Sequence, residues 1–357
     1  MSRDGAEGQP TDQPEWWIYR GTGHVIDEGE RDRRWPTPPR WRAFDGGPEQ
    51  PPAPPEDPDA GRRLGTVVLA DRLDEPEVGE VEMVNAALYL RRPLLVTGRP
   101  GSGKSSLAYR IARELRLGRV LHWPITTRTT LRSGLYEYDA IGRVEAARHA
   151  GASAGAEPAE APEIGEFVHL GPLGTALLPY RRPRVLLIDE LDKSDLDLPN
   201  DLLNVFEDGE FEIRELVRVR GRSPEVTVHT ADPDGRASVR GGWVRTREFP
   251  ITVITSNDER DFPAPFLRRC LQLRLPDPDE RKLARMVQAH FPAGAAGTEQ
   301  LLQLFLQRRE RLGGLAADQL LNAFQLATSG AFRADDPGGW DGLLEAIWHR
   351  LTPAGSG

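Results

Sequence analysis

The stretch LLVTGRPGSGKSS, residues 94–106, decides how the rest of the chain is interpreted. Its first four residues predict a short buried strand, and the residues from Ser105 onward have the spacing of an amphipathic helix. Between the two, Gly98 to Ser105 fits the pattern GxxxxGK[ST] in the strand–loop–helix setting that this pattern requires. A chance glycine-rich turn would have to meet the same constraints in the same setting. We therefore expect a phosphate-binding loop.

The predicted loop offers a different contact at each position. Backbone N–H groups of such a turn point at phosphate oxygens, and the helix beginning near Gly103 adds its positive end. Lys104 is expected to reach the β- and γ-phosphates, and Ser105 to ligate Mg²⁺ through its hydroxyl. The expected nucleotide-binding set is Gly98, Arg99, Pro100, Gly101, Ser102, Gly103, Lys104, Ser105 and Ser106.

Two further apolar segments end in polar side chains. Val185 to Ile188 leads into Asp189 and Glu190, at the strand end where open α/β sheets bind ligands. Asp189 is expected to hold Mg²⁺ through its water shell, and Glu190 to polarise the attacking water. Ile251 to Thr255 leads toward Asn257, which could contact the γ-phosphate or orient that water. Such residues often only cap turns or face solvent, but their order after the loop favours a site.

An arginine pair closes a short predicted helix just before the next strand. Arg268 and Arg269 precede Cys270 and the apolar segment Leu271 to Leu275. An arginine at this place could point toward the phosphate of a neighbouring subunit. The alternative is an ordinary surface residue, because only three of the 46 basic residues are lysines and arginine fills most basic positions.

The pattern of segments predicts an α/β fold with a parallel sheet, followed by a helical domain. Strand-like and helix-like segments alternate over residues 64–276, which indicates a sheet flanked on both faces. Residues 277–352 are almost wholly helical in pattern, and residues 353–357 form a short flexible tail. The Ala/Gly/Pro/Glu-rich residues 144–164 are expected to be a flexible insertion.

Residues 1–63 are expected to be an extended arm. Residues 1–60 hold 11 of the 31 prolines, including a polyproline-type stretch from Pro48 to Pro58. Half of the eight tryptophans lie here as well, at Trp16, Trp17, Trp35 and Trp41. Because a disordered tail is poor in aromatic residues, we expect these tryptophans to dock on a folded surface. A disordered tail with incidental tryptophans is the alternative.

Composition excludes several classes of protein. The 357 residues carry a net charge of −9, which argues against broad binding to a nucleic-acid backbone. No run approaches the roughly 18 apolar residues of a membrane span, and the first residues lack a signal-peptide core. The single cysteine fits a reducing cytoplasm, and the seven scattered histidines lack zinc-ligand spacing. A cytoplasmic location without a membrane segment is therefore expected.

Taken as a set, these motifs resemble an AAA+ ATPase. The loop is similar to a Walker A motif, Asp189-Glu190 to Walker B, and Asn257 to a sensor residue. The segments Glu166 to Leu173 and Asn200 to Gly209 narrow the resemblance to the MoxR branch, over roughly residues 64–330. Trp16 to Gly23 and Leu135 to Arg143 are similar to actinobacterial and cyanobacterial members, which are encoded beside von Willebrand factor A proteins in proposed conflict systems.

The resemblance implies ATP and Mg²⁺ as cofactors and a chaperone-like hexameric ring. Within it, Arg269 would be the finger that reaches the neighbour's nucleotide, with Arg268 as second choice. Residues 130–171 would be a helix-2-type hairpin facing the pore, and residues 213–248 a second insertion. One departure is that Gly314 to Asp318 lacks the sensor-2 arginine of the family, so that Arg309 or Arg311 substitutes or coupling to the lid is weaker.

Several functions remain open at this point. The first is a motor that hydrolyses ATP to remodel or activate a partner protein, such as a von Willebrand factor A protein. The second is a slow switch or scaffold that signals through its bound nucleotide, which the missing sensor-2 arginine favours. A GTPase is disfavoured because no NKxD motif occurs, and a nucleic-acid motor because of the acidic balance.

Overall fold

The computed structural model describes residues 14–55, 58–66, 68–69, 73–152, 163–292, 298–312, 314–329 and 337–348. The expected flexible tail, residues 353–357, lies outside this range. In the described ranges, no helix is both long enough and apolar enough to cross a bilayer.

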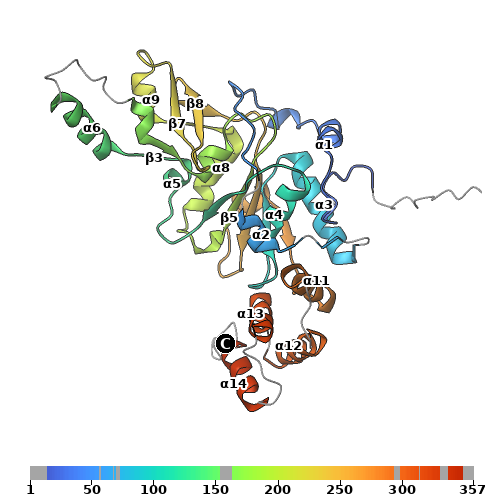
Figure 1. Cartoon of the computed structure of the whole chain (residues 1–357). Helices are drawn as coiled ribbons and strands as arrows, with labels where there is room; N and C mark the ends of the chain where they lie inside the picture. The colour runs from blue at the N-terminus through green and yellow to red at the C-terminus, as the bar shows by residue number, and fades with distance from the viewer. Residues whose placement is uncertain are drawn as a thin grey trace, which may run out of the picture.

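A five-stranded parallel sheet forms the centre of the chain (Figure 1). Its strand order is β11-β1-β10-β5-β2, so the two strands that lead to Gly98 and Asp189 flank the strand that leads to Asn257. The strands are β1 (Leu94–Thr97), β2 (Leu121–Pro124), β5 (Val185–Asp189), β10 (Ile251–Ser256) and β11 (Leu271–Arg274).

Both faces of the three central strands, β1, β10 and β5, are buried, which explains why these strands are mainly apolar rather than alternating. Leu94, Val96 and Leu187 belong to one hydrophobic cluster, together with helices α3 (Glu75–Leu90) and α4 (Lys104–Glu114). Leu95 and Ile188 point into a second cluster on the opposite face, together with α7 (Pro172–Ala176) and α8 (Leu198–Asp208). The α/β fold predicted from the sequence is confirmed.

The two predicted insertions join in a second sheet of six strands, which the sequence did not indicate. Its order is β3-β4-β7-β8-β9-β6, and a single register pair, His169 with His229, links the first insertion to the second. The strands are β3 (Tyr136–Tyr138), β4 (Val168–Leu170), β6 (Glu210–Glu212), β7 (Glu225–His229), β8 (Arg236–Arg240) and β9 (Trp243–Arg245).

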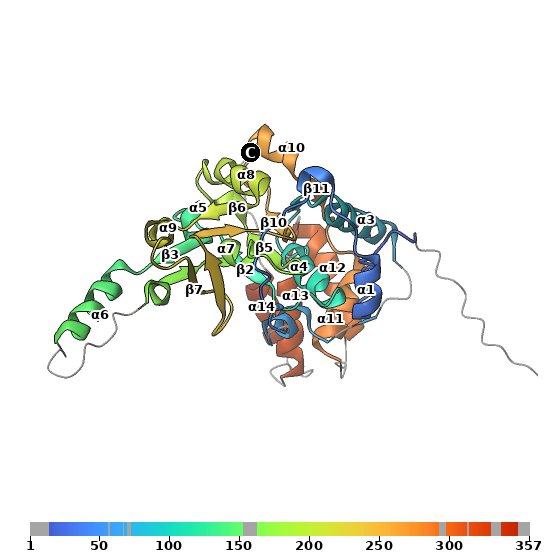
Figure 2. The ribbon, with the colours of Figure 1, turned by 90° about the horizontal axis from the view of Figure 1, so that it is seen from above.

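Part of the segment expected to be a flexible insertion is helical. Helix α6 (Ala140–Ala152) follows β3 and projects away from the body in both views (Figures 1 and 2). Alanine-rich sequence with few β-branched residues favours a helix even where nothing covers it. The remainder of the insertion includes residues 153–162, which lie outside the described residues.

Four helices after the last strand form the helical region expected from the sequence. They share a hydrophobic cluster of their own, centred on Leu283, Phe305, Phe324 and Trp348. In Figure 1 this region, called the lid below, lies at the end of the molecule away from α6. The helices are α11 (Glu280–His290), α12 (Thr298–Leu312), α13 (Ala317–Thr328) and α14 (Pro337–Ile347).

The arm follows the surface of the core and contains several short helices. Trp17 is 3% exposed and Trp35 packs against the cluster that contains α3, so the docking expectation is confirmed for these two. It is wrong for Trp41, which is 79% exposed, and Trp16 remains partly exposed.

The remaining elements are α1 (Glu28–Arg34), η1 (Arg40–Arg42), α2 (Pro58–Leu64), α5 (Leu131–Leu135), η2 (Ile164–Phe167), η3 (Leu191–Lys193), α9 (Arg214–Val219) and α10 (Ala264–Arg269).

Candidate nucleotide-binding site

The predicted phosphate loop connects β1 to α4 and needs its glycines. Gly98, Gly101 and Gly103 all have positive φ angles, of 148°, 78° and 91°, which side chains with a Cβ rarely adopt. Gly101 also has no room for a Cβ, which would lie 2.6 Å from the backbone nitrogen of Ala317 at the start of lid helix α13. The loop therefore touches the lid directly through its backbone.

Lys104 begins helix α4, and its side chain is largely buried. Its Nζ donates to the carbonyl oxygens of Gly98 and Arg99, at 2.8 and 2.9 Å. Burial lowers the pKa of the ammonium, and the nearby carboxylates of Asp192 and Asp189 oppose that shift. The cation thus lies at the mouth of the loop, held by two neutral acceptors that a more strongly charged ligand could replace.

Asp189 lies at the end of β5 and gathers three partners. The Ser105 hydroxyl and the Thr255 hydroxyl each donate to its Oδ1 at 2.7 Å, and a ring nitrogen of His122 lies 3.1 Å from Oδ2. Burial alone would raise the pKa of this carboxyl, but the hydrogen bonds to His122, Ser105 and Thr255 outweigh it and lower the pKa to about 2. Asp189 is therefore ionised at neutral pH.

Glu190 follows with a left-handed backbone, at φ 60°, which is uncommon for a residue with a side chain. Its backbone N–H donates to the Thr255 hydroxyl at 2.8 Å, which fixes the turn. The amide Nδ2 of Asn257 donates to Oε1 at 3.2 Å, and Lys193 Nζ lies 2.6 Å from Oε2. The expected pair of Glu190 and Asn257 is thus in direct contact.

Arg269 lies away from this group. It ends helix α10, and its guanidinium is paired with Glu207 of α8 at 2.6 Å. In the sheet register Leu271 lies beside Leu94, at the amino end of the strands, whereas the phosphate loop follows their carboxyl ends. Four residues of strand span about 13 Å, so Arg269 and the loop of the same chain are on opposite edges of the sheet.

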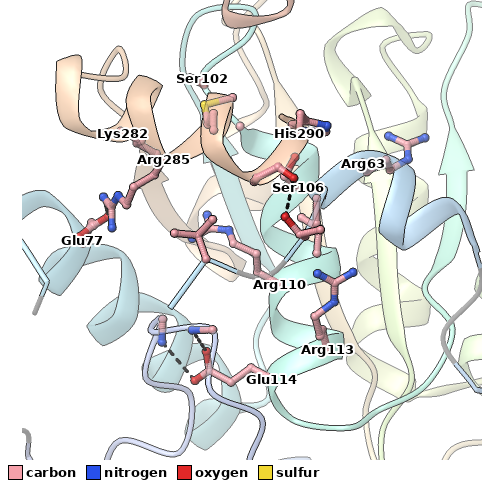
Figure 3. A pocket seen from close by; sticks show the side chains of 18 of the residues that line it. Arg63, Glu77, Ser102, Ser106, Arg110, Arg113, Glu114, Lys282, Arg285 and His290 are labelled. Atoms are coloured by element: carbon pink, nitrogen blue, oxygen red, sulfur yellow. Dashed lines mark hydrogen bonds and ion pairs between the residues drawn. The ribbon is translucent and has the colours of Figure 1, made fainter. Parts of the chain in front are cut away.

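A pocket continues from the loop and is closed by the arm and the lid (Figure 3). Its loop side is formed by Ser102, Gly103 and Ser106. The remaining walls come from five segments of the arm, the core and the lid. Their lining residues include Tyr19, Gly21, Gly23, Arg63, Arg110, Glu114, Lys282, Arg285 and His290.

The stretch Arg20 to Gly23 of the arm is held at this pocket by a single carboxylate. Glu114, at the end of α4, accepts hydrogen bonds from the backbone N–H groups of Arg20, Gly21 and Gly23, the last two at 3.1 and 3.4 Å. Figure 3 shows Glu114 directed at this turn. The sequence analysis assigns no site to this stretch, and a pair of glycines after an aromatic segment is the one local signal that it offers.

Charged pairs tie the pocket walls together. Arg110 of α4 makes two hydrogen bonds to Glu80 of α3, at 2.7 and 3.0 Å, and Arg285 of the lid pairs with Glu77. Lys282 also lines the pocket, and burial lowers the pKa of its ammonium. All three lysines of the chain, Lys104, Lys193 and Lys282, therefore lie in or beside this site.

The comparison with known families agrees with this architecture. Residues 93–270 match the family model of the AAA domain, dynein-related subfamily. No curated protein matches the sequence.

Among solved structures, the chain matches the protein NtrX from Brucella abortus. The match to its complex with ADP is 14% identical in sequence and has a TM-score of 0.36. It covers 69% of this chain and 49% of the NtrX chain. The complex of NtrX with ATP, also 14% identical, covers 69% of this chain and 44% of that chain, with a TM-score of 0.33. The chain thus spans about half the length of NtrX or less.

Proposed function

We propose that this chain binds and hydrolyses ATP. The observation that carries the proposal is that three neighbouring parallel strands, β1, β10 and β5, bring Lys104, Asp189, Glu190 and Asn257 to one edge of the sheet. These residues supply a cation, an ionised carboxylate, a second carboxylate and an amide. Groups of these kinds bind the phosphates and the metal and position the attacking water in phosphoryl transfer to water. The AAA domain over residues 93–270 supports the same reaction.

The residues at the end of β5 fit a magnesium ion. The Ser105 hydroxyl and the ionised Asp189 carboxylate offer the oxygen ligands that Mg²⁺ prefers. Among the described residues, no group of three or more His, Cys, Asp or Glu side chains could hold a metal unaided. Ser105 and Asp189 would therefore hold Mg²⁺ together with phosphate oxygens, and the bound ion would neutralise charge on the β- and γ-phosphates.

Glu190 is the group we assign to the attacking water. Asn257 holds Oε1 and Lys193 holds Oε2, so the carboxylate has a defined orientation although it is partly exposed. From this position Glu190 accepts a proton from water while Asn257 orients the reactants. Lys104 exchanges its two carbonyl acceptors for phosphate oxygens, a stronger partner for an ammonium group.

The pocket between arm and lid is assigned to the nucleoside part of ATP. It opens from Ser102 and Gly103 of the loop and is closed by Tyr19 of the arm and by the lid residues Lys282 and Arg285. A ligand bound there touches three parts of the chain at once. Binding would therefore stabilise the arm and the lid on the core.

Hydrolysis is proposed to occur between subunits of a closed, six-membered ring. Arg269 lies on the edge of the sheet opposite the loop, so it can approach only the nucleotide of another copy. Contacts between two different faces of identical chains are heterologous, and they form a ring when the rotation from one copy to the next closes. This arrangement, with the motifs quoted above, supports a MoxR-type, chaperone-like ATPase of the cytoplasm.

In this proposal the ring remodels or activates a protein partner, with a von Willebrand factor A protein of a bacterial conflict system as the first candidate. The insertion bearing α6 would face the pore. The second candidate function is a slow switch that signals by its bound nucleotide. The contacts of the lid favour this function, because the segment Gly314 to Asp318 holds no arginine that could reach the nucleotide from the lid. Arg309 donates instead to the Pro278 carbonyl oxygen at 2.6 Å, and Ala316 and Ala317 lie beside the loop.

Turnover by a Glu190→Gln variant tests the proposal. The amide is nearly isosteric with the carboxylate but cannot accept a proton from water. We expect ATP and Mg²⁺ to bind as in the wild type while hydrolysis stops, because Lys104, Ser105 and Asp189 are untouched. Normal hydrolysis by the variant would remove Glu190 from the reaction. Measuring wild-type turnover with and without the partner separates the motor from the slow switch.

A further inference from the structure

Trp41 is the most exposed large apolar side chain among the described residues, at 79%, yet it stands on a fixed turn. The turn is the 3-10 helix Arg40–Arg42, whose last residue is buried. Arg42 donates to the carbonyl oxygen of Phe206 and lies over the ring of Phe249, at 5.6 Å from its centroid. Because Arg42 holds the backbone of this turn, docking of the Trp41 indole requires little ordering of the main chain, which favours an interface anchor.

The surroundings of Trp41 are strongly basic. Arg42 and Arg269 both pair with Glu207, at 3.6 and 2.6 Å. The guanidinium of Arg92 donates to the backbone carbonyls of Arg268 and Arg269. We call this surface the basic face. Its exposed or partly exposed members are Arg40, Trp41, Arg92, Arg268 and Arg269, with Glu207 among them, and Arg42 is buried beneath it. Figure 2 shows helices α8 and α10, which carry Glu207 and Arg269, side by side.

A second surface has the opposite charge and its own exposed apolar residue. The loops after β5 and β10 are joined because Asp192 accepts hydrogen bonds from the N–H groups of Asn257 and Glu259, at 2.9 and 3.3 Å. Leu196, 62% exposed, lies in the first loop. We call this surface the acidic face. Its acids are Asp195, Asp197, Asp258, Glu259 and Asp261, and its cations are Lys193 and Arg260.

The two faces cannot meet within one chain. Arg92 and Arg269 precede strands β1 and β11, so the basic face lies at the amino edge of the sheet. The loop that carries Leu196 follows β5, so the acidic face lies at the carboxyl edge. Complementary charge on opposite edges of one molecule fits a second copy placed head to tail.

We propose that Trp41 of one subunit docks on the acidic face of the next copy, against Leu196. This inference deepens the proposed ring and rests on it, because the same contact brings Arg269 to the neighbour's nucleotide. The apolar pair supplies the buried centre of the interface, and the arginines and acids form its charged rim. Residues of the arm, and not only the AAA domain, then hold the ring together.

Sedimentation velocity in AMP-PNP and Mg²⁺ tests the contact, using full-length chains over a range of concentrations. Trp41→Ala and Leu196→Asp should each raise the concentration of half-assembly at least about tenfold, as expected for loss of an interface anchor. Ile141→Ala is the matched control, since Ile141 is 74% exposed but lies on α6, away from both faces. Nucleotide affinity of the monomers should be unchanged, because neither residue lines the pocket.

Mixing the two variants gives the sharpest result. The Trp41→Ala chain keeps an intact acidic face, and the Leu196→Asp chain keeps Trp41. One intact contact can therefore form, between Trp41 of a Leu196→Asp chain and the acidic face of a Trp41→Ala chain. The mixture should form dimers that do not grow, at concentrations where neither variant associates alone. Raising the salt concentration should weaken wild-type assembly, because charge complementarity contributes.

The outcomes separate this inference from the function on which it rests. If the wild type assembles and Trp41→Ala assembles equally well, the docking of Trp41 is refuted, the ring stands, and Trp41 belongs to a different partner. The absence of dimers in the mixture also refutes it. If the wild type remains monomeric with nucleotide at every concentration, the proposed ring and the docking of Trp41 both fail.

Discussion

Replacing Arg269 by alanine should stop hydrolysis without unfolding the chain or removing ATP. Arg269 makes an ion pair with Glu207 in which both side chains are more than a third exposed. Exposed pairs of this kind contribute about 0–1 kcal/mol to the free energy of unfolding. The variant should therefore melt within a few degrees of the wild type, and its pocket, on the opposite edge of the sheet, should bind ATP normally.

The loss in rate should be much larger. An arginine that stabilises charge on the transferring phosphoryl group is worth roughly 10³–10⁵ in turnover when a second subunit supplies it. Leu94 and Gly98 are separated by about 13 Å of strand, which places Arg269 out of reach of the loop in its own chain. Turnover per subunit in the wild type should consequently rise with protein concentration.

The assay combines dilution with mixing. Steady-state hydrolysis is measured from the monomeric range upward for the wild type, for Arg269→Ala, for Glu190→Gln and for an equal mixture of the two variants. Arg269→Ala retains its pocket and Glu190→Gln retains its finger, so a mixed ring regains activity where the two meet. Flat activity on dilution together with no rescue in the mixture would refute hydrolysis in trans and leave Arg269 an ordinary surface residue.

Three other changes probe the site and its supports. Lys104→Ala should abolish ATP binding, measured by titration calorimetry, because it removes the cation directed at the β- and γ-phosphates. Deleting residues 1–47 should lower the melting temperature, by roughly 2–4 °C for each kcal/mol lost, because Trp17 and Tyr19 are buried in the core. The pKa of Asp189 is about 2 in the folded chain against an ordinary 3.8, so its ionised form should contribute about 2 kcal/mol to the free energy of unfolding above pH 4. Urea titrations should show this contribution disappear as the pH falls toward 2.

Each of these three has a result that would contradict it. Wild-type affinity in Lys104→Ala would show that the loop does not bind phosphate. An unchanged melting curve after the deletion would mean that the arm adds nothing to the fold. For Asp189 the control is Asp189→Asn, whose stability should lack this pH dependence; equal curves for variant and wild type would show that the carboxylate is not preferentially ionised in the folded state.

The central sheet could be predicted because each of its strands carries a local signal. Val185 to Asp189 and Ile251 to Ser256 are continuous apolar runs, since both sheet faces are covered. A proline precedes each of them, Pro183 and Pro250, and the order of motifs places Lys104, Asp189 and Asn257 at one edge. The strand limits differ by only a residue or so from those expected, for example Ile251–Ser256 against Ile251 to Thr255.

The second sheet and the pocket depend on contacts between distant segments, which no local pattern encodes. Strands β3, β4, β6 and β9 have three residues each, too few for alternation to be recognised. Gly21 and Glu114 are 93 positions apart, and their hydrogen bond follows from how the arm wraps around α4. His122 and Thr255, the unexpected partners of Asp189, come from two strands on either side of β5.

The contact between Gly101 and the first residues of α13 makes the lid a direct reporter of the loop's shape. A Cβ on Gly101 would lie 2.6–2.9 Å from Ala316 and Ala317, so the two backbones already pack without space between them. Any change in the curvature of the loop therefore displaces the start of α13. A long arginine side chain would link the loop to the lid flexibly, whereas this contact between two backbones is rigid. Its tightness depends on the absence of a Cβ at Gly101.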